Sequence, residues 1–238
     1  MDGWEIVLGA AVVAAGASVQ GVVGFGASLF AVPFLLLIDP AFVPGPALVG
    51  GLALNILMLL GHRSHTDWSG LRWMAGGLLP GSVVGGLALS AFPSDDLAIL
   101  SGIAILLAVA LSAFGRSPRR SRAWLLGGGV VSGYMGTTAA VSGPPLALLY
   151  QHEEGPTIRG TLPPAFLLSA LLALATLAMA GRLPARDWAV GLALAPGGAV
   201  GFLLSQRAAH RVRGAVLRVG VLAVSAASAA AAIIRAMT

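Results

Sequence analysis

The stretch that decides the fold covers residues 18–33 and reads SVQGVVGFGASLFAVP, three glycines and small residues inside an apolar region that runs from about residue 6 to 38. As one straight helix this region would be about 50 Å long, against about 30 Å for the hydrocarbon core of a bilayer. Split at the glycines, it gives pieces of roughly 15 and 12 residues, each too short to cross easily. We therefore expect a helix–break–helix hairpin that enters the membrane and returns to its own side.

A related interruption occurs in the second half of the chain, at residues 132–145, which read SGYMGTTAAVSGPP. At a constant spacing, three residues of the first stretch fall opposite three of the second: Gly21, Gly24 and Pro33 against Gly133, Gly136 and Pro145. The repetition predicts a duplicated protein. We place the first membrane repeat at 1–115, an arginine-rich linker at 116–123 and the second repeat at 124–238.

The composition identifies an integral membrane protein. Hydrophobic residues make up 57% of the 238 residues and charged residues only 10%, too little polar surface to cover a soluble globule. The net charge of +5 comes from arginines in short loops, which argues against a nucleic-acid partner because no broad basic face can be drawn. The absence of cysteine excludes disulfides and thiolate chemistry. We expect a lipid bilayer as partner, no metal and no cofactor, and leave an oligomer open.

Each interrupted stretch precedes three apolar segments of roughly the length that a transmembrane helix needs. They cover residues 44–61, 73–92 and 97–114 in the first half, and 162–180, 188–204 and 215–234 in the second. The predicted fold class is therefore an all-α polytopic membrane protein with two inverted-topology repeats, each an interrupted helical hairpin followed by three transmembrane helices. Three crossings per half force the two halves into opposite orientations.

Charge placement favours this topology over eight plain spans. The inverted arrangement puts ten arginines on the cytoplasmic side, as the positive-inside rule requires: Arg63, Arg72, Arg116, Arg119, Arg120, Arg122, Arg159, Arg207, Arg211 and Arg213. It leaves Arg182, Arg186 and Arg235 outside, together with the acidic N-terminus and the pair Asp95 and Asp96. Eight plain spans would instead place the cluster at 207–213 outside.

The motif GxxGFGxxLxxxP, preceded by Gln20 and followed by SGxxG and SGPP elements in the second half, resembles the TauE/SafE family of sulfite exporters over the whole chain. The resemblance implies a transporter in the inner membrane of a bacterial cell, rather than an enzyme, that exports sulfite or a small sulfur-containing organic anion such as sulfoacetate. A channel-like permease for another small anion or solute is the alternative. A membrane-embedded enzyme is disfavoured, since no cluster of catalytic side chains appears at one depth.

The interruptions suit an anion because a helix that begins at a break presents unpaired N–H groups and the positive end of its dipole. We expect the substrate site to be built from glycines and polar or aromatic residues of the two interruptions, with one amide from the next span. The candidates are Gln20, Gly21, Gly24, Phe25, Gly26, Asn55, Gly133, Gly136, Thr137, Thr138, Ser142 and Gly143. Ser28 is a weaker candidate. All nine acidic residues fall at segment ends or connectors, so a carboxylate-driven pump is disfavoured.

Overall fold

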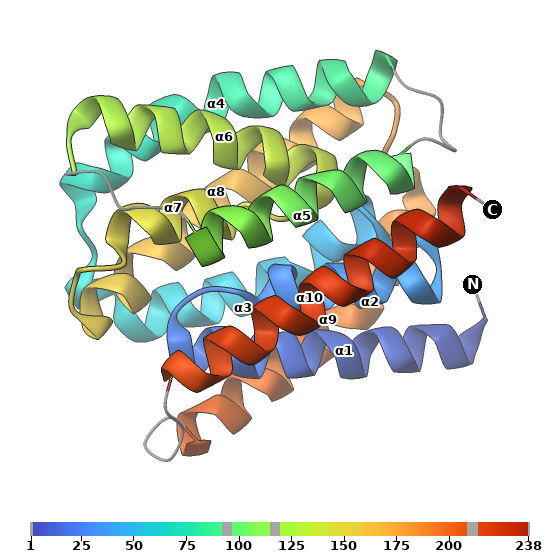
Figure 1. The fold of residues 1–238 in the computed structure, drawn as a ribbon, viewed down its shortest axis with the longest axis horizontal. Helices are drawn as coiled ribbons and strands as arrows, with labels where there is room; N and C mark the ends of the chain where they lie inside the picture. Colours follow the sequence, from blue (N-terminus) through green and yellow to red (C-terminus); the bar gives the residue numbers. More distant parts are fainter. Residues whose placement is uncertain (1, 92–96, 115–119, 209–213, 238) are drawn as a thin grey trace.

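The chain folds into a bundle of helices (Figure 1). The computed structural model describes residues 2–91, 97–114, 120–208 and 214–237, and within these ranges there is no strand. The helices of the first half are α1 (Gly3–Val23), α2 (Ala27–Ile38), α3 (Gly45–His62), α4 (Trp68–Ala91) and α5 (Leu97–Phe114). Those of the second half are α6 (Arg122–Ala139), α7 (Gly143–Tyr150), α8 (Gly155–Met179), α9 (Ala185–Ala208) and α10 (Gly214–Met237). Short 3-10 turns, η1 (Pro40–Phe42) and η2 (Arg63–His65), flank α3.

The all-helical, multi-pass character expected from the sequence is confirmed. In the described part of the chain, five helices are long and apolar enough to cross a membrane: Gly3–Val23, Gly45–His65, Trp68–Ala91, Gly155–Met179 and Ala185–Arg207. Many large apolar side chains on them face outward, among them Leu79, Leu87 and Leu203. Such side chains are suited to contact with lipid tails rather than water.

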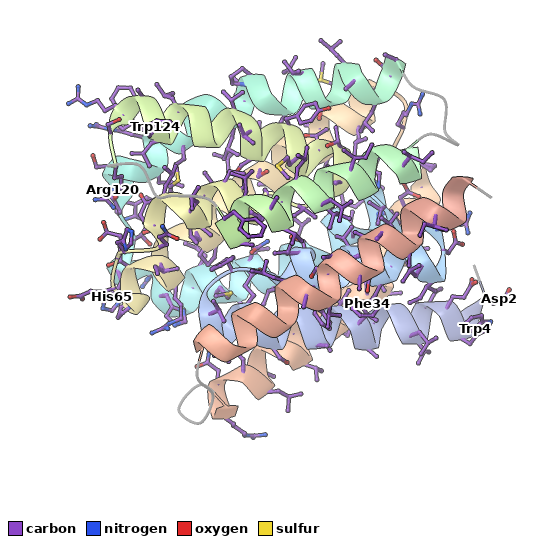
Figure 2. All side chains as sticks on the ribbon, viewed as in Figure 1. Asp2, Trp4, Phe34, His65, Arg120 and Trp124 are labelled. Carbon is purple, nitrogen blue, oxygen red and sulfur yellow. The ribbon has the colours of Figure 1, made fainter. Side chains whose placement is uncertain are left out.

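Helices of the two halves contact one another in matching pairs. α4 packs along α6 as α9 packs along α1, and α9 contacts α3 as α4 contacts α8. α6 runs along the bundle in the direction opposite to α1 (Figure 1). Trp4, near the start of α1, and Trp124, near the start of α6, accordingly lie at opposite ends of the bundle (Figure 2).

The first arm of the first hairpin is longer than predicted. α1 has 21 residues, against the roughly 15 of the sequence estimate, because the helix begins at Gly3 and continues through Gln20 and Gly21. At this length α1 can cross a bilayer, so the expectation of two short arms was wrong for this arm. α2, with 12 residues, remains short and runs back along α1.

The structure contains a helix break in each half, as predicted. The second break lies about one helical turn later than the alignment of Gly24 with Gly136 predicts. The first break covers Gly24, Phe25 and Gly26, where both glycines have positive φ angles, 96° and 105°. The second covers residues 140–142 and begins at Ala140, whose φ is 55°. Gly133 and Gly136 are inside α6 rather than in the break.

Glycines allow the backbones of α4 and α6 to approach each other closely. A Cβ on Gly77 or Gly81 of α4 would overlap the backbone of α6, and a Cβ on Gly129 or Gly133 of α6 would overlap the backbone of α4. This is the small-residue packing that membrane helices use to approach closely. On the opposite pair, Gly197 and Gly201 of α9 lie in the same way against the backbone of α1.

Several charged residues of the topology prediction lie outside the described residues: Asp95, Asp96, Arg116, Arg119, Arg211 and Arg213.

Candidate functional site

A cavity of about 70 Å³ lies inside the bundle and is lined by both halves of the chain. Its walls come from α1, α2, α3 and α8 and from the break that precedes α7. One water needs roughly 10–15 Å³ on this measure, so the space can hold several waters or one small ion. The polar lining side chains are Gln20, Ser28, Asn55 and Ser142, and the other lining residues are apolar or glycine.

Gln20 joins three helices at one corner of the cavity. Its amide Nε2 donates to Asn55 Oδ1 at 3.0 Å and contacts Met58 Sδ at 3.5 Å, both on α3. Its Oε1 accepts from the backbone N–H of Ala27, the first residue of α2, at 3.2 Å. Gln20 is 4% exposed and Asn55 9%, so both amides are removed from bulk water, and an amide without a partner at this depth is costly. The amide of Gln20 thereby fixes the start of α2.

The start of α2 supplies unpaired backbone donors. Gln20 satisfies the N–H of Ala27, whereas the N–H groups of Ser28 and Leu29 have no acceptor among the described residues. Asn55 Nδ2 likewise has no partner in that part of the chain. Ser28 and Asn55 line the cavity. The positive end of the α2 dipole and an amide donor therefore converge on one space.

The second interruption contributes a side-chain hydroxyl to the cavity rather than backbone N–H groups. Pro144 and Pro145 occupy the second and third positions of α7 and have no N–H to offer. Ser142 lines the cavity, and its backbone carbonyl accepts from Ser132 Oγ at 2.8 Å, which anchors the break against α6. No capping bond occupies the Ser142 side chain. The cavity therefore receives a hydroxyl from the second half and backbone donors mainly from the first.

The structure brings together some of the residues expected at the site. Gln20, Asn55 and Ser142 line the cavity, and so does Ser28. Gly136 and Gly143 do not line the cavity, but each contacts a residue that does. A Cβ on Gly136 would meet Ser142 Cβ at 3.2 Å, and one on Gly143 would meet the ring of Phe166 at 3.8 Å.

The other expected residues are not part of the cavity lining. Thr137 and Thr138 donate their hydroxyls to carbonyls of their own helix, those of Gly133 and Tyr134, at 2.9 Å each. Gly21 packs against Ser205 of α9, and Gly133 against α4. Phe25 packs against the apolar cluster that includes Leu146 and Phe166. Gly24 and Gly26 form the turn into α2 beside the cavity.

Sequence reasoning missed Gly51 and the apolar walls. A Cβ on Gly50 would meet Leu194 at 3.0 Å, as expected of a packing glycine, but a Cβ on Gly51 would meet nothing within 4 Å. Gly51 faces the cavity. No local pattern separates these two neighbours, because the difference depends on which face of α3 meets α9 and which meets the cavity.

A cation lies next to the first break. A Cβ on Gly24 would meet Ile158 Cγ2 at 2.8 Å and Arg159 Cγ at 3.3 Å, so the break rests against the first turns of α8. Arg159 is half-buried and has no carboxylate partner in the described part of the chain. It places a positive charge near the break without lining the cavity itself.

A cavity lined by neutral donors between two interrupted helices, in a bundle of apolar helices, is the arrangement of a membrane transport protein. The chain matches the model of the sulfite exporter TauE/SafE family over residues 8–232 and belongs to this family. The resemblance noted in the sequence is thus confirmed. Membership implies a membrane transporter of sulfur compounds rather than an enzyme. No curated protein and no solved structure matches the chain.

Proposed function

We propose that this protein exports sulfite or a small organic sulfonate such as sulfoacetate across the inner membrane of a bacterial cell, and that the cavity is its central binding site. The observation that carries the proposal is that neutral donors line one internal cavity: the free N–H of Ser28, the Asn55 amide and the Ser142 hydroxyl. Sulfur oxyanions present oxygen acceptors to such donors. Family membership supports the substrate class.

The surroundings favour a singly charged form of the substrate. Most of the cavity wall is apolar, and in the described part of the chain no arginine, aspartate or glutamate lines it. Transferring a dianion into such a space is much more costly than transferring a monoanion, since neutral donors compensate only part of the lost hydration. Hydrogen sulfite and simple alkanesulfonates are monoanions, whereas sulfate and sulfoacetate are dianions at neutral pH, so the cavity favours hydrogen sulfite over sulfoacetate.

Two inverted repeats, at 1–115 and 124–238 and joined by residues 116–123, are part of the proposal. Support comes from the opposite directions of α1 and α6 and from the matching helix contacts. Inverted repeats supply two equivalent bodies, here the α1/α9 and α4/α6 pairs, that can move relative to each other around the cavity and so expose it to each side in turn. The channel-like alternative shares the broken helices but not this alternation.

Export can proceed without a carboxylate-based pump. An inside-negative potential favours the outward movement of an anion by about 2.3 kcal/mol per charge per 100 mV. Arg159, beside the first break, would raise the local concentration of anions at the cytoplasmic mouth.

The test is transport by the purified protein in liposomes, with sulfite, sulfoacetate, thiosulfate and sulfate compared. We expect saturable uptake and countertransport of sulfite, slower transport of the dianion sulfoacetate, and little transport of sulfate. Linear, non-exchanging flux would favour the channel-like permease. If none of the four anions moved faster than in protein-free liposomes, the proposed substrate class would be wrong. Thr137→Val is a matched control because that hydroxyl bonds within its own helix.

A further inference from the structure

A second cavity, distinct from the first, lies at the shared end of α4 and α6. It has a volume of about 320 Å³ and is more open than the internal cavity. The charged residues that line it are Arg72, Arg120, Arg122 and Asp67, with Trp73 and the hydroxyls of Ser69 and Ser121 beside them. We call it the α4/α6 cleft. Arg120 and Trp124 mark this end of the bundle (Figure 2).

One arginine of the cleft is neutralised by acidic partners. Arg120 Nη1 lies 3.2 Å from Asp67 Oδ2 and 3.2 Å from Glu153 Oε1, and its guanidinium stacks on the Tyr150 ring at 5.1 Å. Tyr150 also donates to Asp67 at 2.9 Å. These contacts join the start of α4, the end of α7 and the segment before α6, so the role of Arg120 is structural.

The other two arginines lack such partners. Arg72 and Arg122 converge on the same Trp73 ring, with guanidinium carbons 5.6 and 5.3 Å from its centroid. In the described part of the chain neither has a carboxylate partner. Arg122 is also the first residue of α6, where a cation faces the positive end of the helix dipole. Two guanidinium forks held by one indole, neither paired with a carboxylate among the described residues, suit a phosphate group.

The apolar surface next to the cleft indicates what carries the phosphate. On a helix with about 3.6 residues per turn, Leu79, Val83 and Leu87 lie on the same face of α4 as Arg72. Their exposed fractions are 55%, 45% and 64%. An acyl chain attached to a phosphate at Arg72 and Arg122 could follow this strip along α4. A free anion would make no use of it.

We propose that the α4/α6 cleft binds the phosphodiester headgroup of an anionic phospholipid, with an acyl chain along Leu79, Val83 and Leu87. Trp124, 55% exposed, is at the same end of α6, as expected of a residue at the membrane–water interface. The site does not depend on which anion is transported, because it shares no lining residue with the internal cavity.

The experiment measures lipid binding by the full chain. Native mass spectrometry from nanodiscs with equal amounts of phosphatidylglycerol and phosphatidylcholine should show retention of phosphatidylglycerol. Titration with dioctanoyl phosphatidylglycerol should show roughly 30-fold weaker binding for Arg72→Gln/Arg122→Gln, equal to about 2 kcal/mol at about 1 kcal/mol per arginine. The control Arg63→Gln/Arg207→Gln removes the same charge outside the cleft and should bind within about twofold of wild type.

Two further probes separate a lipid from a free anion. Inorganic phosphate and the water-soluble headgroup glycerophosphoglycerol should compete only weakly, since neither can use the apolar strip. If either competed as well as the lipid, the cleft would be a site for soluble anions and the proposal would be overturned. Equal retention of the two lipids, or undiminished binding by the Arg72→Gln/Arg122→Gln variant, would overturn it as well.

Discussion

The Gln20 side chain donates to Asn55 Oδ1 at 3.0 Å and leaves the Asn55 Nδ2 donors without a protein acceptor in the described residues. The pair thus crosses from α1 to α3 at the wall of the internal cavity. Because Gln20 also accepts from Ala27, this one contact sets both the amide orientation at the cavity and the position of the α2 start.

Removal of either member of this pair should impair transport. Gln20→Ala leaves the Ala27 N–H and the Asn55 carbonyl unpaired, which costs about 1–3 kcal/mol of stability. We expect Gln20→Ala and Asn55→Ala each to reduce sulfite flux at least tenfold, and the double variant to be little worse than the more severe single variant, since the two residues act together. If the double variant instead lost flux by the product of the two single-variant reductions, the two residues would act independently and the prediction would be wrong.

Gly51 and Gly50 should respond in opposite ways to the same substitution. A valine at position 51 enters open space in the cavity, whereas one at position 50 meets Leu194 and the Gly191 carbonyl. Gly51→Val should fold with near wild-type thermal stability in detergent but lose transport. Gly50→Val should lose stability by about 1–3 kcal/mol through overpacking. Full flux in Gly51→Val would show that substrate does not pass through this cavity.

Gly133 should behave as a packing residue rather than a ligand-binding one. An added methyl group would meet the Leu78 carbonyl and the Ser82 N–H of α4. We expect Gly133→Ala to lower the yield of folded protein and the unfolding temperature, while the protein that does fold keeps a wild-type KM for sulfite. A raised KM with unchanged stability would contradict this prediction and would support the role in substrate binding that the sequence suggested for Gly133.

Sulfite transport should follow the concentration of the monoanion. The hydrogen sulfite–sulfite equilibrium lies near neutral pH, so lowering the pH on the loading side at fixed total sulfite increases the monoanion and should raise the flux. A simple alkanesulfonate such as methanesulfonate, at constant membrane potential, serves as the control, since it is a monoanion that does not titrate near neutral pH. A sulfite flux that rose with pH would indicate the dianion and contradict an apolar cavity with neutral donors.

Arg159→Gln should weaken substrate capture more than turnover. Its charge lies beside the Gly24 break, outside the cavity. We expect a KM several-fold higher at low ionic strength, little change in kcat, and a smaller difference in high salt, where the charge is screened. Arg186→Gln provides the control, since it lies at the start of α9, at the opposite end of that helix from Ser205, which packs against Gly21. A KM effect independent of salt would point to direct contact instead.

The overall architecture could be predicted from composition and spacing because hydrophobic segment length leaves few choices in a bilayer. The existence of two interruptions also followed from glycine-rich segments within apolar regions. Their exact positions did not: α6 continues through Gly133 and Gly136, where close approach to α4 selects glycine inside a helix. Sequence alone cannot separate a glycine that allows a turn from one that allows close packing.

The polar part of the site was partly predictable for a similar reason. A buried amide in an apolar helix needs a partner, which singled out Gln20 and Asn55. Thr137 and Thr138 looked equivalent, yet their hydroxyls donate to the backbone of their own helix. A threonine inside a helix can satisfy its hydroxyl in this way, through the carbonyl of the residue four positions earlier. The position of Gly51 in the cavity wall could not be predicted, because it depends on how α3 packs against α9 and no local sequence pattern encodes that packing.

The close glycine contacts of α4 with α6, and of α9 with α1, also bear on motion. In each pair backbone meets backbone, so one helix cannot slide along the other without opening a void or forcing an overlap. Each pair should therefore move as a single rigid body. A Cβ on Gly191 of α9 would also overlap Val49 and the Pro46 carbonyl of α3, so α3 moves with the α1/α9 pair. Rearrangement that opens the internal cavity must then occur at α8 and at the short arms α2 and α7. The glycines that fix these interfaces thus determine at which other helix interfaces movement can occur.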